Sequence, residues 1–371
     1  MRSTVSTTTT TTITRSTASI ARRGLAAVSA VVLGLTVSAC AGATAAQESE
    51  SGKTVLRYQG STGTVGFPEL AADLGYFEDV ELEWIGDTTG GPASIQAAVT
   101  GETEFGGAFN GAISKLQSGG GPVTSVITYY GSDDETYGGF YTLEGSEITS
   151  ARDLIGKKIG VNTLGAQSEF VITEYLRRGG LSQAEIDQVE LVVVPPVNAE
   201  QTLRAGQIDV AALSKVIQEK AIDHGGITKL FSETDIFGEF GYGTYIFRDD
   251  YIAKHEDAVA DFVQGTARAI RWAQVTPVDD VRARMKTIIE ERGHSGETTD
   301  LVQYWLSTGV PVAGGVIDEK EISTWVDWLV ADGQVTEGQL AVDDLYTNEY
   351  NPYANGTYAP DAGPDGEELD S

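Results

Sequence analysis

The 371-residue chain contains very few of the residues that form disulfides, bind metal ions or act as nucleophiles, with one cysteine and three histidines. A single thiol cannot form a disulfide within the chain, and His224, His255 and His294 stand singly, without the spacing of metal ligands. The serine-nucleophile motif Gly-x-Ser-x-Gly and a complete phosphate-binding loop are also missing. We therefore expect a protein without enzyme activity, metal or cofactor.

Basic residues are scarce as well, because 25 lysines and arginines stand against 54 aspartates and glutamates, for a net charge of -29. Four of the arginines lie in residues 1–39, which contain no acidic residue, so the rest of the chain is more acidic still. A surface with this charge repels the phosphates of nucleic acids and of anionic lipid headgroups. We expect a monomer with no nucleic-acid partner.

The single cysteine, Cys40, follows an uncharged stretch, residues 24–37, that is itself preceded by Arg22 and Arg23. A basic segment, an apolar segment and a few small residues, in this order, are typical of a bacterial secretory signal. The apolar segment is too short to span a bilayer, which takes about 20 apolar residues. The order of these segments predicts that the protein leaves the cytoplasm.

Residues 37–40, Val-Ser-Ala-Cys, resemble the bacterial lipobox, in which the cysteine carries a diacylglycerol group and becomes the first residue of the mature protein. We expect a lipoprotein signal peptide over residues 1–39 and a flexible tether over residues 40–52. The protein would then be extracytoplasmic and anchored to the cell membrane through its lipid. The alternative is ordinary signal cleavage near residues 43–45, which would discard Cys40.

The length of the chain is enough for about two domains. From Lys53 to about Asp249, short β-branched runs alternate with amphipathic stretches, and helical periodicity alone continues beyond that point. This alternation is typical of the α/β class, with sheets covered by helices. Strands are expected at residues 55–58, 80–84, 123–129, 158–161, 190–194, 210–213 and 244–248, and helices at residues 68–75, 92–100, 111–117, 166–178, 199–205 and 215–224.

Four stretches, taken in order, resemble the solute-binding proteins of ABC importers that serve nitrate, taurine, aliphatic sulfonates and thiamine-pyrimidine precursors. They are residues 67–77, 90–106, 148–181 and 203–212. The resemblance implies a fold like that of the type II periplasmic binding proteins, with two α/β lobes, a ligand cleft between them and a helical C-terminal part. It places the first part of lobe 1 at residues 53–142, lobe 2 at 143–240, the return to lobe 1 at 241–354 and an acidic disordered tail at 355–371.

The function implied by this resemblance is delivery of a small organic anion, such as a sulfonate, taurine or nitrate, to the permease subunits of an ABC importer. No arginine lies in the expected ligand loops. An amine or a planar heterocycle, such as a pyrimidine precursor, therefore stays open as the ligand. An extracytoplasmic enzyme or sensor on the same scaffold is a further alternative.

Ligands of open α/β sheets bind beyond the carboxyl ends of the strands, where helices begin with free N–H groups. Loops with this placement, and aromatic residues near them, give the candidate ligand-binding residues Thr62, Gly63, Phe67, Thr89, Gly90, Gly91, Phe109, Asn110, Tyr130, Thr163, Gly165, Ala166, Ser168, Ser214 and Tyr242. The alternative is that the loop residues only cap helices and that the aromatic residues only fill the core. Lys115, Lys215 and Arg248 are possible anchors for an anion, but solvated surface positions are expected for them.

Overall fold

The computed structural model describes residues 48–49 and 51–369. The predicted signal peptide, Cys40 and most of the predicted tether lie outside the described residues. No helix in the described part of the chain is long and apolar enough to cross a membrane.

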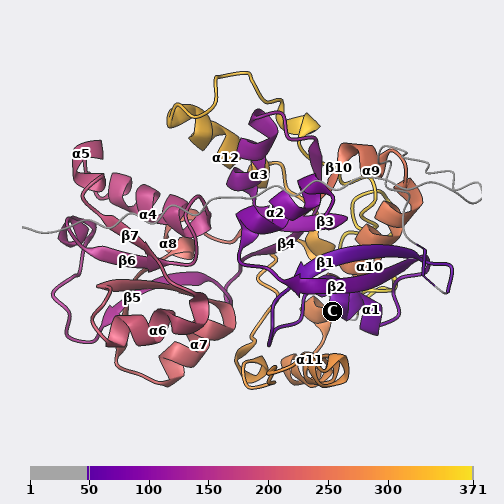
Figure 1. Cartoon of the computed structure of the whole chain (residues 1–371), viewed down its shortest axis with the longest axis horizontal. Helices are drawn as coiled ribbons and strands as arrows, with labels where there is room; N and C mark the ends of the chain where they lie inside the picture. Colours follow the sequence, from indigo (N-terminus) through magenta and orange to yellow (C-terminus); the bar gives the residue numbers. More distant parts are fainter. Residues whose placement is uncertain (1–47, 50, 370–371) are drawn as a thin grey trace, which may run out of the picture. The chain divides into compact units, whose positions relative to one another are not determined.

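The strands form three sheets (Figure 1). Strands β1 and β2 pair in parallel, β10 lies between β3 and β4 and is antiparallel to both, and the third sheet has the order β7-β6-β8-β5-β9. We call the part with the first two sheets lobe 1 and the part with the five-stranded sheet lobe 2. The strands are β1 (Thr54–Gly60), β2 (Val80–Asp87), β3 (Phe105–Phe109), β4 (Val123–Ser132), β5 (Gly138–Leu143), β6 (Lys158–Val161), β7 (Glu190–Val193), β8 (Val210–Ser214), β9 (Ile227–Ser232) and β10 (Phe240–Arg248).

Helices α1 to α3 and every helix after β10 belong to lobe 1: α1 (Phe67–Asp73), α2 (Gly91–Thr100), α3 (Asn110–Ser118), α9 (Asp249–Ile252), α10 (Glu256–Val275), α11 (Val278–Arg292), η2 (Val302–Tyr304), η3 (Ala313–Gly315), α12 (Lys320–Ala331) and η4 (Val342–Asp344). Lobe 2 contains η1 (Ala151–Leu154), α4 (Gln167–Arg178), α5 (Gln183–Ile186), α6 (Pro196–Arg204), α7 (Lys215–Asp223) and α8 (Glu233–Phe237). The expected strands and helices are thus all present.

The core of lobe 1 forms around the apolar face of α10, which lies beside α1 in Figure 1. Phe262 of this helix is completely buried and contacts the ring of Phe105, with 4.5 Å between the ring centroids. Burying a side chain of this size stabilises the fold by about 2–3 kcal/mol. The long C-terminal helix therefore holds the first sheets of the chain together.

Both faces of the five-stranded sheet in lobe 2 are covered by helices (Figure 1). Ile159 and Val210 pack with Leu176 of α4 in one cluster, and Leu213 packs with Leu203 of α6 in another. Strands that are covered on both faces need apolar side chains at almost every position. This explains why β6 and β8 were recognisable in the sequence.

Three strands, β3, β5 and β9, were not predicted. Strand β3 has the sequence Phe-Gly-Gly-Ala-Phe and β5 begins with two glycines, so both have low strand propensity. A methyl group on Gly107 of β3 would lie 2.8 Å from the ring of Tyr129, and one on Gly139 of β5 would lie 2.6 Å from the ring of Tyr141, so both positions favour glycine. Since β5 pairs with β8 and β9, lobe 2 begins at Gly138, before the predicted boundary at residue 143.

The prediction of a disordered acidic tail was wrong for residues 355–369. The hydroxyl of Tyr353 donates to the carbonyl oxygen of Gly363 at 3.0 Å. Two arginines of α10 donate to tail carbonyl groups, Arg268 to Pro364 at 3.0 Å and Arg271 to Ala362 at 2.7 Å. These arginines of α10 offset the acidic charge of the tail. The composition of the tail alone does not reveal them, because they lie far away in the sequence.

The two segments that connect the lobes lie side by side, because the end of β4 pairs with the start of β10 and Gly131 stands opposite Gly241. A methyl group on Gly131 would overlap the carbonyl oxygen of Phe240, and one on Gly241 would overlap the carboxyl group of Glu321. Only glycine allows this close approach of the two backbones. The two connecting segments therefore run close together between the lobes.

Candidate functional site

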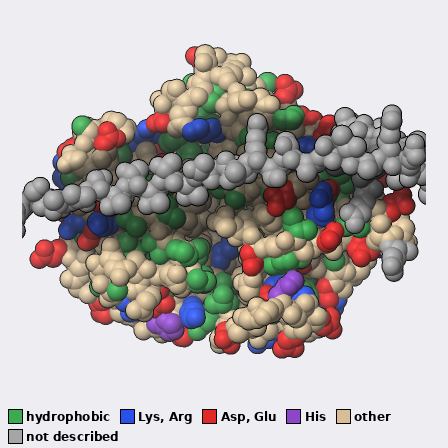
Figure 2. All heavy atoms as spheres, viewed as in Figure 1, with side chains coloured by type: hydrophobic (Ala, Val, Ile, Leu, Met, Phe, Trp, Pro, Cys, Tyr) green, Lys and Arg blue, Asp and Glu red, His purple; other side chains and the backbone are tan. Residues whose placement is uncertain are grey.

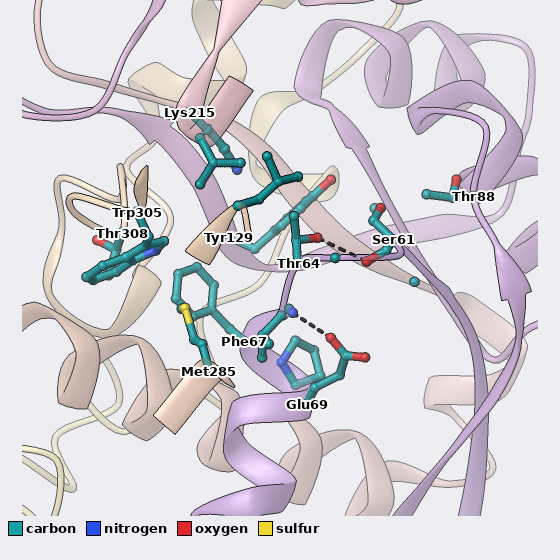
Figure 3. Close-up of a pocket in the computed structure, with 18 of the residues that line it drawn as sticks. Ser61, Thr64, Phe67, Glu69, Thr88, Tyr129, Lys215, Met285, Trp305 and Thr308 are labelled. Atoms are coloured by element: carbon teal, nitrogen blue, oxygen red, sulfur yellow. Dashed lines mark hydrogen bonds between the residues drawn. The ribbon is translucent and has the colours of Figure 1, made fainter. Parts of the chain in front are cut away.

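Two adjoining cavities lie between the lobes. The first, which we call the central cavity, has a volume of about 290 Å³ and is lined by lobe 1 loops that follow β1 and β2, by the start of α7 in lobe 2 and by residues 301–308 (Figure 3). The second, which we call the lobe 2 cavity, has about 370 Å³ and is lined by the starts of α4 and α7 and by the ends of β4 and β8. Figure 2 shows hydrophobic side chains gathered in the hollow between the lobes.

Large aromatic and apolar side chains form one wall of the central cavity. Phe67, Tyr129, Met285 and Trp305 surround the space in Figure 3. The ring of Tyr129 is held in place by stacking on Tyr245, with 4.0 Å between centroids and 16° between planes. Rigid rings of this kind bind flat apolar groups well.

The backbone N–H groups of the loop after β1 point to carboxylates of the chain itself. Gly63 donates to Oε1 of Glu297 at 2.7 Å, and Gly66 donates to Oε2 of Glu69 at 2.6 Å. Thr62 uses both its N–H and its hydroxyl group on Oδ1 of Asp87, at 3.0 and 2.7 Å. These three N–H groups already have anionic acceptors.

Glu69 is the buried centre of a polar network at the edge of the central cavity. Its Oε1 accepts hydrogen bonds from the hydroxyl of Tyr58 at 2.8 Å and from Nη1 of Arg292 at 2.7 Å. Arg292 also pairs with Glu297 and donates to the carbonyl oxygen of Thr64 at 2.7 Å. The guanidinium of α11 therefore fixes the backbone of the loop.

Burial raises the pKa of Glu69, and the nearby Arg292 opposes this effect. Burial also acts to raise the pKa of Glu297, but hydrogen bonds from Arg292 and from the Gly63 N–H outweigh it and lower that pKa. In this network the carboxylates of Glu69 and Glu297 both pair with the single guanidinium of Arg292.

Lys215 is the only lysine or arginine that lines either cavity in the part of the chain that the structure describes. It begins α7 with φ of 50°, a left-handed conformation that is rare outside glycine. Its Nζ lies 5.1 Å from the ring centroid of Tyr130. Lys215 is exposed, as expected, but it borders both cavities and does not lie on the outer surface of the lobe.

The surroundings of Lys215 are only partly polar. The residue keeps contact with solvent through the cleft, yet burial of the ammonium group among protein atoms lowers its pKa, and Glu233 acts against this. Glu233 itself is buried and accepts hydrogen bonds from the Ser132 hydroxyl at 2.7 Å, the Gly138 N–H at 2.5 Å and the Gln167 amide. Burial raises the pKa of Glu233, and these donors oppose the shift.

The structure brings most of the predicted site residues to the two cavities. The central cavity is lined by Gly63, Phe67, Gly90 and Gly91, and the lobe 2 cavity by Gly91, Phe109, Tyr130, Ala166, Ser168 and Ser214. Thr62, Thr89, Thr163 and Gly165 line neither cavity. Asn110 and Tyr242 are completely buried away from both, and Asn110 donates to the carbonyl oxygen of Glu321 at 3.0 Å.

The sequence analysis missed Glu69, Tyr137, Glu233 and Trp305, which also line the cavities. Glu69 stands three residues after Gly66 at the start of a helix, a spacing that signals a capping interaction. Trp305 lies in a segment without regular periodicity, so no pattern in the sequence points to it.

Two α/β lobes that are joined by paired connecting segments and enclose a cavity define the fold of the periplasmic binding proteins, and the predicted fold class is confirmed. Residues 69–280, more than half of the chain, match the family model described as NMT1/THI5 like. The chain therefore belongs to the NMT1/THI5-like family, which confirms the resemblance found in the sequence.

Several solved structures share this fold. The alkanesulfonate-binding protein SsuA from Xanthomonas axonopodis pv. citri, bound to MOPS, is 18% identical with a TM-score of 0.61, and the match covers 79% of this chain and 98% of that chain. The periplasmic nitrate-binding protein NrtA from Synechocystis PCC 6803 is 12% identical with a TM-score of 0.61, covering 80% and 87%. The desulfurization enzyme DszB is 16% identical with a TM-score of 0.53, covering 80% and 97%. Comparison with curated proteins gives no match.

Proposed function

We propose that this protein is an extracytoplasmic solute-binding protein that delivers a small organic molecule to the permease of an ABC importer. The observation that carries the proposal is the central cavity, whose lining comes from lobe 1, from Lys215 of lobe 2 and from residues 301–308. A ligand in this space touches both lobes at once, so its binding energy favours the closed arrangement of the lobes. The binding proteins with this fold, SsuA and NrtA, support the role.

The cavity supports a ligand with a flat, apolar body better than it supports a small inorganic anion. Phe67, Tyr129 and Trp305 offer ring surfaces, whereas the N–H groups of the loop after β1 are occupied by carboxylates. A planar heterocycle, one of the alternatives from the sequence, is therefore preferred to nitrate or taurine. A ligand with one anionic group would place that group at Lys215.

The first experiment is native mass spectrometry of the protein as purified, followed by calorimetry with pyrimidines, aryl and alkyl sulfonates, taurine and nitrate. We expect a retained or tightly bound ring-containing solute, recovered chemically unchanged after incubation. Binding of nitrate and taurine with no binding of ring compounds would contradict the proposed ligand class. Conversion of the solute into a product would instead indicate an enzyme.

We also propose that Cys40 carries a lipid that holds the receptor near its permease, after removal of residues 1–39. A single acyl chain gives weak membrane binding, whereas two chains hold a protein stably. In a bacterial host, the chain should fractionate with membranes and incorporate labelled fatty acid. The variant Cys40→Ser should lose the label and become soluble, and membrane retention of this variant would contradict the anchor.

A further inference from the structure

Resting on the proposed receptor role, we infer that Glu69 is a specificity-determining residue. Its carboxylate occupies a cluster of hydrogen-bond donors at the lobe 1 wall of the central cavity and thereby excludes the anionic groups of solutes from that wall. The wall then contacts the uncharged part of the ligand.

Three donors of different kinds converge on this carboxylate. The Tyr58 hydroxyl and Arg292 Nη1 reach Oε1 at 2.8 and 2.7 Å, and the Gly66 N–H reaches Oε2 at 2.6 Å. A guanidinium, a hydroxyl and an amide are the groups that a small carboxylate, sulfonate or nitrate needs. Tyr58, Gly66 and Glu69 all line the central cavity, and Figure 3 shows the Glu69 carboxylate beside Phe67 with its hydrogen bond to the backbone.

The position of Glu69 makes it a strong competitor for these donors. The residue is only 8% exposed, and it is covalently attached to the same wall, so its effective concentration exceeds that of a free solute. A solute anion beside it would meet a like charge at short range. Arg292 does not attract that anion in the wild type, because its guanidinium is already paired with both Glu69 and Glu297.

The test removes the carboxylate and supplies a free one. Glu69→Ala leaves the three donors around a space that opens to the cavity, so we expect acetate and nitrate to bind at least tenfold more tightly than to the wild type. The measurement is calorimetry and thermal unfolding at constant ionic strength with chloride as the reference anion. Glu69→Gln fills the space and keeps an acceptor, so no gain is expected. Glu291→Ala is the control, because Glu291 is an exposed carboxylate on α11.

Folding of the variant is followed by circular dichroism. If Glu69→Ala unfolds easily, recovery of its unfolding midpoint by acetate and not by chloride supports the inference, and no recovery overturns it. The inference is also overturned if a folded Glu69→Ala binds acetate and nitrate no more tightly than the wild type does. The receptor role fails separately, if the wild type binds no organic solute of any class.

Discussion

Glu321 of α12 gives a sharp prediction about the pH dependence of stability. The residue is completely buried, and its Oε2 accepts one hydrogen bond from the Thr128 hydroxyl at 2.6 Å. Among the residues that the structure describes, its Oε1 has no hydrogen-bond partner. Burial raises the pKa of Glu321 to about 7, and the hydrogen bond from Thr128 opposes the shift only in part.

The sign of the effect follows from the order in which the two states lose the proton. Below pH 4.5, the ordinary value, the carboxyl group is protonated in both the folded and the unfolded chain, and its contribution to stability is fully present. As the pH rises from there to about 7, the unfolded chain releases its proton first. At about 1.4 kcal/mol per pKa unit, the free energy of unfolding falls by about 3 kcal/mol over this interval.

The assay compares urea unfolding of the wild type and Glu321→Gln at pH 5 and pH 7.5, followed by tryptophan fluorescence, since Trp325 lies one turn away on the same helix. The amide cannot ionise, so the free energy of unfolding of the variant relative to the wild type should rise by about 2–3 kcal/mol between the two pH values. Glu319→Gln, at an exposed position beside α12, is the control. A relative stability that does not change with pH would refute the reasoning.

Three further substitutions test the core, the lobe connection and the cavity. Phe262→Ala should lower the free energy of unfolding by about 3–5 kcal/mol, whereas Val275→Ala, on the exposed side of α10, should change it by less than about 0.5 kcal/mol. Gly131→Ala should lower the free energy of unfolding by about 1–3 kcal/mol or more, because the new methyl group overlaps the backbone at Phe240. Gly119→Ala, whose methyl group would have a nearest contact of 3.4 Å, is the control. Equal stability of the two variants would contradict the packing argument. Trp305→Ala should weaken solute binding about tenfold in calorimetry, whereas Trp328→Ala, outside both cavities, should leave affinity unchanged.

Elements with strong local patterns could be predicted from the sequence. Strands such as β6 and β8 are short apolar runs because both faces of their sheet are covered, and α10 shows one apolar face over its whole length. Strands β3 and β5 could not be predicted, because their glycines have low strand propensity. The reason for Gly107 of β3 lies in a distant part of the sequence, since a methyl group there would lie 2.8 Å from the ring of Tyr129 on β4. The tail could not be predicted either, since its order depends on Arg268 and Arg271 of α10.

Some residues of the candidate site could likewise be predicted from the sequence, and others could not. The glycines of the loops after β1 and β2 could be placed at the cleft, because strand-to-helix loops at the carboxyl ends of a sheet lie together. The place of Lys215 at the cleft could not be predicted, since no local sequence pattern indicates that its backbone is in the left-handed region or that it lines both cavities. Asn110 and Tyr242 stand beside such loops in sequence, but their side chains are completely buried away from both cavities.

The chemistry of the loop after β1 depends on contacts between distant residues. Glycines and hydroxyl residues in this loop favour an anion cradle when the sequence is considered locally. In the structure, the acceptor for Gly63 comes from Glu297, 234 positions later, and Arg292 returns from the same region to pair with Glu69. A donor-rich loop therefore indicates where an anion can bind, and the rest of the fold decides whether that anion is a solute or a side chain.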